Sequence, residues 1–135
     1  MGLMPKKKPL ENAAKTDVRK LLDKHNWRHW ANAAGPFSVH GIPDRMAVRD
    51  GMFMAIEVKR AGGVVTSLQR KFLQDVQAAG HFAFVVDPAR MQAFTNFLES
   101  LDISIEAQQK HQEVPPEHGS RMLNCVFALT KELRS

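Results

Sequence analysis

The chain has 135 residues, which is the size of one domain with a moderate core. Its hydrophobic content of 44% and charged content of 24% are ordinary for a globular protein, and no apolar run approaches the roughly 18 residues that a membrane span needs. The formal net charge of +5 fits a nucleic-acid binder, but it also fits a basic soluble protein without such a partner. Cys125 is the only cysteine, so no internal disulfide can form, which suits a reducing cytoplasm.

Residues 1–9 form a basic, proline-containing segment. No apolar stretch follows its lysines, so it does not resemble a signal peptide. Lys6 stands where a myristoylation motif would have serine or threonine. The segment is predicted to be a flexible arm, and an arm that contacts phosphates is the alternative.

A helical pattern runs from Leu10 to about His25. Glu11 falls in the predicted first turn, where the helix dipole favours an acidic side chain, so its presence needs no catalytic role. The apolar residues recur at spacings of three and four, as the buried face of a helix requires; they are Leu10, Ala14, Val18, Leu21 and Leu22.

Residues 26–34 contain two tryptophans and are predicted to form a strand after a turn. Trp27 and Trp30 are expected in the core or in an interface rather than stacked on bases. His25 and His29 have the i,i+4 spacing of a zinc pair on a helix, but no third ligand stands at a recognisable spacing. A structural role is therefore favoured for both histidines.

The next segment, residues 35–41, is punctuated by glycine and proline and is predicted as a loop or a short edge strand. It leads directly into Pro43 and Asp44. Its polar residues Ser38 and His40 are therefore candidates for substrate contacts, and ordinary surface residues are the equal alternative.

Two apolar runs follow, over residues 44–49 and 52–59. Asp50 and Gly51 lie between them, and Asp-Gly between apolar runs is a strong hairpin signal. Both runs are apolar along most of their length, as central strands covered on both faces should be.

Three charged residues at the ends of these strands need an explanation. The hairpin returns Glu57 and Lys59 to the neighbourhood of Asp44, and residues two apart in a strand point to the same face. Charges at the ends of buried strands are costly unless they are paired or bind a metal. A surface ion pair explains Glu57 and Lys59 but not Asp44. An Asp, a Glu and a Lys at one edge of a sheet can instead hold a divalent metal and activate water.

A glycine-rich loop leads from the second strand to the next helix. Thr66 is a suitable N-cap for a helix over residues 67–79, and Gly80 is suited to end it. Gln69 lies in the first turn of this helix, on the side that can face the edge of the sheet.

The rest of the chain is predicted as a strand over residues 81–86, a helix from Asp87 to about Leu101, a polar linker over residues 108–120 and a terminal helix over residues 122–133. Cys125 is explained as a small apolar residue of that last helix.

The order of these elements resembles the PD-(D/E)xK nuclease superfamily, whose motif is carried here by Pro43-Asp44 and Glu57-Val58-Lys59. A closer resemblance is to the stand-alone VRR-NUC (virus-type replication-repair nuclease) domains of phages. The resemblance covers about residues 10–101. Its motifs are Gly41–Asp44, Ala55–Lys59, Thr66–Gln69 and Ala78–Gly80.

The residues and the resemblance both imply metal-assisted hydrolysis of phosphodiesters. Asp44 and Glu57 are expected to ligate Mg²⁺ or Mn²⁺, hard cations that prefer oxygen. The backbone carbonyl of Val58 completes the site in this interpretation. Glu11 would reach the same ion or a second one, although the family's usual Pro-Glu-Gly is replaced here by Leu-Glu-Asn.

Two further residues receive roles in the same interpretation. Lys59 is expected to orient the attacking water or to stabilise the developing negative charge. Gln69 is expected to position Lys59 or a substrate phosphate. Alanine at Asp44, Glu57 or Lys59 should then abolish Mg²⁺- or Mn²⁺-dependent cleavage and leave the fold intact.

The predicted fold is α/β, with a restriction-endonuclease-like core in which helices flank a mixed sheet, in the order α-β-β-β-α-β-α plus a C-terminal helix. Residues 1–9 are expected to form the arm, 10–101 the nuclease domain, and 102–135 a linker and a helix for possible dimerisation.

The expected function is that of a structure-selective DNA endonuclease similar to Holliday-junction resolvases. Such an enzyme needs two active sites, which implies a homodimer. A flap nuclease, a restriction-type endonuclease and a catalytically silent DNA-binding module are the alternatives. The expected location is a bacterial or phage-infected cytoplasm, with no membrane and no small-molecule cofactor involved.

Overall fold

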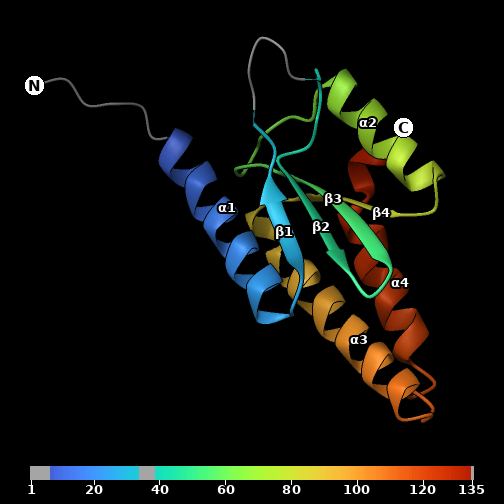
Figure 1. Cartoon of the computed structure of the whole chain (residues 1–135). Coiled ribbons are helices and arrows are strands. Elements are labelled where there is room, and N and C mark those ends of the chain that lie inside the picture. Colours follow the sequence, from blue (N-terminus) through green and yellow to red (C-terminus); the bar gives the residue numbers. More distant parts are fainter. Residues whose placement is uncertain (1–6, 34–38, 135) are drawn as a thin grey trace, which may run out of the picture.

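A computed structural model of the chain describes residues 7–33 and 39–134. The predicted order of helices and strands is confirmed (Figure 1). The arm expected at residues 1–9 lies mostly outside the described residues, and residues 7–9 already belong to the first helix. The elements are α1 (Lys7–Lys24), β1 (Arg28–Ala31), β2 (Arg45–Arg49), β3 (Met52–Val58), α2 (Ser67–Ala78), β4 (Phe82–Val86), the 3-10 helix η1 (Pro88–Arg90), α3 (Met91–Gln109), α4 (His118–Leu129) and the 3-10 helix η2 (Lys131–Leu133).

The four strands form one mixed sheet in the order β1-β2-β3-β4. β1 and β3 both pair antiparallel with β2, and β4 joins β3 in parallel after the α2 crossover. The hairpin between β2 and β3 turns at Asp50 and Gly51, whose φ angles are 47° and 79°. A type I′ turn needs positive φ at both central residues, which Asp-Gly supplies at low cost. The hairpin prediction is therefore confirmed.

Helices cover both faces of the sheet, and the alternation of side chains along β3 assigns residues to each face. Met54, Ile56 and Val58 point into a cluster with α1, α3 and α4. Ala55 points to the opposite face, where Leu73 of α2 and Leu133 close the second cluster. Glu57 follows Ala55 in this alternation and therefore lies on the α2 side of the sheet.

The start of the chain differs from the prediction at one point that bears on the site. α1 begins at Lys7, so Glu11 lies in its second turn, and the first turn contains no acidic residue. The helix dipole acts mainly on the first turn, so it does not account for Glu11. The turn predicted before β1 is confirmed, because Asn26 has a φ of 64°.

The helix predicted to end near Leu101 continues to Gln109, and the polar linker shrinks to residues 110–117. No glycine or proline interrupts residues 102–109. The added turns pack against α4 and bury Ala107. The terminal helix ends at Leu129 rather than Leu133. Cys125 is buried there, as predicted. None of the helices described is both long and apolar enough to cross a membrane.

Candidate active site

Asp44 lies at the point where the chain enters β2, and both its backbone and its carboxylate are fixed. Its Oδ2 accepts a hydrogen bond of 2.7 Å from the Val58 N–H, at the end of β3. Its own N–H donates to Glu57 Oε1 at 3.2 Å, and its carbonyl accepts from the Asn32 N–H at 2.9 Å. Oδ1 faces Lys15 Nζ of α1 across 3.5 Å. The aspartate thus joins β3, the segment after β1 and α1 at one end of the sheet.

Glu57 is the buried centre of the site, with 2% of its surface exposed. Its Oε2 lies 3.0 Å from Lys59 Nζ and accepts a hydrogen bond of 3.0 Å from Gln69 Nε2. With the Asp44 N–H on Oε1, the carboxylate contacts three of the predicted site residues. The structure therefore brings Asp44, Glu57, Lys59 and Gln69 together.

Burial and, to a smaller extent, the neighbouring charge of Asp44 raise the pKa of Glu57 from 4.5 to about 7. Lys59 opposes this rise through its positive charge and its hydrogen bond. Burial and the charge of Asp44 together outweigh Lys59, so the ionised Glu57 carboxylate is disfavoured. A proton or an additional cation beside Glu57 would stabilise the site.

The loop that carries Asp44 rests on the start of α2 at a glycine. Gly41 has a φ of +78°, and a Cβ atom there would lie 2.6 Å from the backbone carbonyl carbon of Leu68. No larger residue fits this approach without a backbone shift. The glycine of the Gly-Ile-Pro-Asp motif therefore fixes the approach to Asp44 against the helix turn that contains Gln69.

Gln69 both starts α2 and contacts the site. Its Oε1 accepts from the Thr66 N–H at 2.9 Å, while Thr66 Oγ1 accepts from the Gln69 N–H at 3.1 Å. These reciprocal bonds form a capping box. Since Oε1 is used as an acceptor, Nε2 is left to donate to Glu57. Gln69 thus contacts Glu57, whereas the sequence suggested Lys59 or a phosphate.

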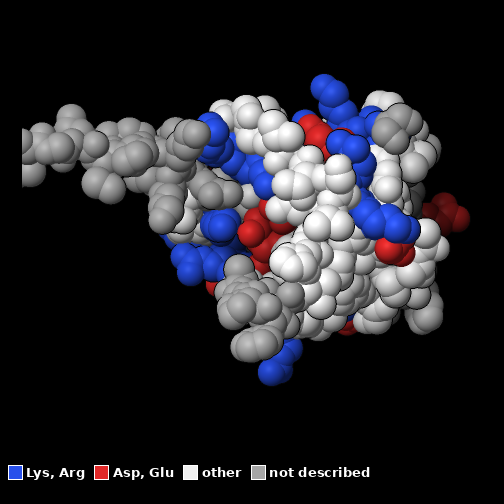
Figure 2. Space-filling model, turned by 90° about the horizontal axis from the view of Figure 1, so that it is seen from above, with Lys and Arg blue, Asp and Glu red and all other residues white. Residues whose placement is uncertain are grey.

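A small hollow of about 110 Å³ lies beside Asp44 and Val58. Three of its lining residues, Lys15, Asn32 and Arg45, were not among the sequence candidates. A signal existed for Lys15, which stands four residues after Glu11 and so shares its face of a helix. Figure 2 views this end of the molecule and shows a red acidic patch bordered by blue Lys and Arg side chains on the α1 side.

The two histidines that have the i,i+4 spacing of a zinc pair lie in separate networks. α1 ends at Lys24, so His25 and His29 do not share a helix. His25 Nδ1 lies 2.5 Å from Asp102 Oδ2. His29 lies in β1 and contacts other partners. The structural role favoured from the sequence agrees with these contacts.

The other candidates do not join the site among the described residues. His40 is exposed, and Ser38 lies outside the described residues. Trp27 is buried in the core as expected, whereas Trp30 is 43% exposed and is not a core residue. The side chain of Glu11 also lies outside the described part of the chain.

The oxygen atoms at this site fit a hard divalent cation. Asp44 and Glu57 provide neighbouring carboxylates, and Val58 lines the hollow beside Asp44. The raised pKa of Glu57 marks a place where a positive charge would be stabilising. Within residues whose side chains are described, no group of three or more His, Cys, Asp and Glu is placed to hold a metal. Glu11 is outside that set.

These contacts define a site of two acids, a lysine and a glutamine at one end of a mixed sheet. Its chemistry has to be inferred from this geometry and from the motifs that supply it. Comparisons of the chain with models of protein families, with curated proteins and with solved structures found no match.

Proposed function

We propose that this chain is a divalent-metal-dependent endonuclease that hydrolyses phosphodiester bonds in DNA. The observation that carries the proposal is the convergence of Asp44, Glu57 and Lys59 within one hydrogen-bonded group, where β2 starts and β3 ends. A PD-(D/E)xK nuclease needs this arrangement of its motif. The net charge of +5 is consistent with a polyanionic substrate.

Asp44, Glu57 and the carbonyl of Val58 would hold Mg²⁺ or Mn²⁺, and Glu11 is a further candidate ligand. Such an ion, when bound, supplies Lewis-acid activation of the phosphodiester and of the attacking water. The protein's part is to keep the two carboxylates adjacent. Two hydrogen bonds from backbone N–H groups hold them there: the Asp44 N–H donates to Glu57, and the Val58 N–H donates to Asp44.

Lys59 supplies the positive charge of the site. Its Nζ lies 3.0 Å from Glu57, and its side chain is only 15% exposed. Gly63 packs against the aliphatic part of the Lys59 side chain, since a Cβ atom built on Gly63 would lie 3.2 Å from Lys59 Cβ. The ammonium group is thus positioned before substrate binds, and a fixed charge stabilises a developing anion better than a mobile one. Lys59 would orient the water or stabilise the charge on the phosphate.

We place the enzyme in a bacterial or phage-infected cytoplasm and propose branched DNA as its substrate, from the resemblance to VRR-NUC domains. Symmetric cutting of a four-way junction needs two copies of the site, so we also propose a homodimer. α4 exposes Leu123 and Phe127, which are candidates for that contact. Light scattering of the full chain tests the dimer.

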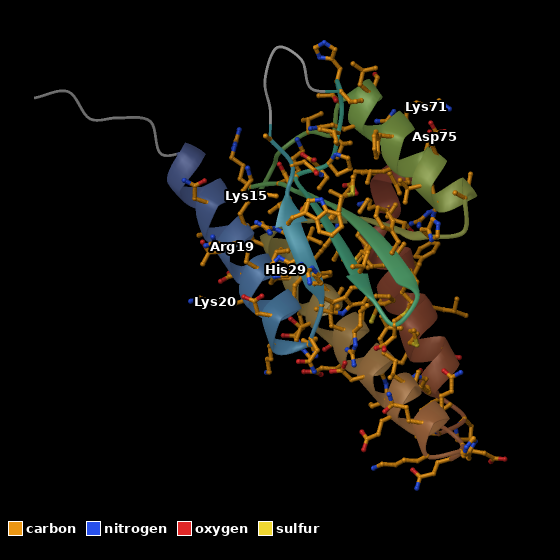
Figure 3. The ribbon with its side chains drawn as sticks, in the orientation of Figure 1. Lys15, Arg19, Lys20, His29, Lys71 and Asp75 are labelled. Carbon is orange, nitrogen blue, oxygen red and sulfur yellow. The ribbon has the colours of Figure 1, made fainter. Side chains whose placement is uncertain are left out.

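The test is a cleavage panel of four-way junction, flap, splayed-arm and linear duplex DNA with Mg²⁺, Mn²⁺ or EDTA. Asp44→Asn and Lys59→Met each remove one charge from the site. Asp75→Asn and Lys71→Met make the same changes on α2, where the two side chains form an exposed ion pair away from the sheet (Figure 3). We expect the site variants to lose at least roughly 100-fold in rate and the control variants to keep their activity.

A catalytically silent DNA-binding module is the second candidate, because both Glu57 oxygens already have partners within the protein. Calorimetric titration with Mn²⁺ separates the two. An active nuclease requires Mn²⁺ binding that Asp44→Asn weakens. Absence of both binding and cleavage, or equal activity of Lys59→Met and wild type, would exclude the proposed mechanism.

A further inference from the structure

We propose that Lys15, Arg19 and Arg45 form a phosphate track that binds the backbone of one nucleic-acid strand beside Asp44. None of the three was a sequence candidate. The proposal rests on the proposed function for the identity of its ligand, and it adds where and through which side chains the substrate is held. The track begins in the hollow next to the predicted catalytic residues and continues along α1.

Lys15 is the member closest to the site. It lines the hollow with Asp44 and Arg45, and its side chain is 40% exposed. Its Nζ lies 3.5 Å from Asp44 Oδ1, which is an ion pair too long for a strong hydrogen bond. A partly exposed pair of this kind contributes little to stability. The ammonium group can therefore contact an incoming phosphate at little cost.

Arg45 is oriented by a chain of side-chain hydrogen bonds. Its NH1 donates to His29 Nδ1 at 2.8 Å, and His29 Nε2 lies 2.6 Å from Asp23 Oδ1. Arginine has only donors, so His29 Nδ1 accepts and Nε2 carries the hydrogen towards Asp23. One side of the guanidinium is held in this way, and among the described residues Arg45 makes no other side-chain hydrogen bond, so its remaining N–H groups can face a ligand in the hollow. Planar N–H donors of this kind suit phosphate oxygens.

Arg19 extends the positive surface along α1. Arg19 lies on the same face of α1 as Lys15, because residues four apart on a helix are neighbours. Its NH2 donates to Thr16 Oγ1 at 3.3 Å. Lys15 and Arg19 are four residues apart, hence about 6 Å along the helix axis. That distance is comparable to one or two phosphate steps along a strand.

The charge balance at this place favours an extended anion. Among the residues whose side chains are described, the nearest acids to the three cations are Asp44, next to Glu57, and Asp23, which is already bonded to His29. A divalent ion at Asp44 would make the surface still more positive. The row of cations ends at the carboxylates of Asp44 and Glu57. It therefore fits a nucleic-acid strand whose backbone follows α1 and whose scissile phosphate lies at these two carboxylates.

The test measures binding separately from cleavage. Fluorescein-labelled single-stranded and duplex DNA are titrated with the full chain in EDTA at several KCl concentrations. Lys15→Gln and Arg19→Gln should each weaken binding and reduce the slope of log K against log[KCl] by about 1, and the double variant by about 2. Thermal melting of each variant checks that the fold is kept.

Two control variants remove the same charge elsewhere. Lys20→Gln lies on α1 but about 140° around the helix from Lys15, and Lys71→Gln lies on the outer side of α2 (Figure 3). Both should leave the slope unchanged. If they lower it as much as Lys15→Gln and Arg19→Gln, binding follows net charge and the track is wrong.

The outcomes of binding and cleavage are distinguishable. If the wild type cleaves DNA with Mn²⁺ but Lys15→Gln and Arg19→Gln leave the slope of log K against log[KCl] unchanged, the phosphate track is wrong and the proposed function stands. If Lys15→Gln and Arg19→Gln reduce the slope, the control variants do not, and no DNA is cleaved, the phosphate track is supported and the proposed nuclease activity is wrong. A wild-type chain that binds neither DNA overturns the track.

Discussion

The buried Glu57 should make the metal-free chain less stable as the pH rises. Its pKa in the folded chain is about 7, against an ordinary value of 4.5, because burial and the charge of Asp44 disfavour the ionised carboxylate. Between these pH values the folded chain keeps a proton that the unfolded chain has released. The contribution of Glu57 to the free energy of unfolding is therefore complete below about pH 4.5 and is lost as the pH rises through about 7.

The size of this loss follows from the two pKa values. They differ by about 2.5 pH units, and one unit corresponds to roughly 1.4 kcal/mol, so the chain should lose about 3 kcal/mol across the window. A domain of this size has a total stability of roughly 5–15 kcal/mol. The effect is thus large enough to measure by urea unfolding in EDTA.

Glu57→Gln isolates the effect because it removes the titrating group. The amide of this variant faces donors on Lys59 and Gln69, so its free energy of unfolding differs from that of the wild type at every pH. That part of the difference does not depend on pH, because an amide does not ionise. The difference between wild type and variant should change by about 3 kcal/mol between about pH 4 and pH 8. Asp44→Asn should reduce that change, since it removes one cause of the raised pKa. Parallel curves for wild type and Glu57→Gln would refute the assigned pKa.

Three further predictions concern the residues that hold the site. Gln69→Ala should cost roughly 1–2 kcal/mol in urea unfolding, since it removes the capping box and the bond to Glu57, and Gln77→Ala, exposed on the same helix, should cost little. Gly41→Ala should cost at least about 1 kcal/mol because of its positive φ and its contact with α2, whereas Gly119→Ala should be neutral or stabilising. Glu132→Gln breaks the bidentate ion pair with Arg90 of η1, so the amides of η2 should lose protection from hydrogen exchange. Equal protection in the variant and the wild type would contradict this.

Local sequence signals determined much of this fold. Asp50-Gly51 identified the hairpin because few residues adopt positive φ at two consecutive positions. Thr66 and Gln69 identified the start of α2 because a capping box is made within one turn. The convergence of Asp44 and Glu57 then followed from the length of the hairpin. Each of these inferences depends on residues close in sequence or joined by one turn.

The features that the sequence did not predict depend on packing between distant elements. Lys15 reaches Asp44 only because α1 crosses the end of the sheet, and the i,i+4 spacing of Glu11 and Lys15 does not specify that long-range contact. The orientation of Arg45 depends on His29 and Asp23 from two other places in the chain. α3 continues past Leu101 because α4 folds back against it, which apolar periodicity within α3 alone does not show.

The position of the site is determined by a turn at the opposite end of the hairpin. Arg45 pairs with Ile56, so the next position along each strand places Asp44 beside Glu57. A slip of one residue in this register would turn Glu57 away from Lys59 and Gln69 and towards the apolar cluster under α1, α3 and α4. β3 has seven residues, so Gly51 lies about 20 Å from the site and contacts none of it. The Asp-Gly turn is thus a requirement of the chemistry as well as of the fold.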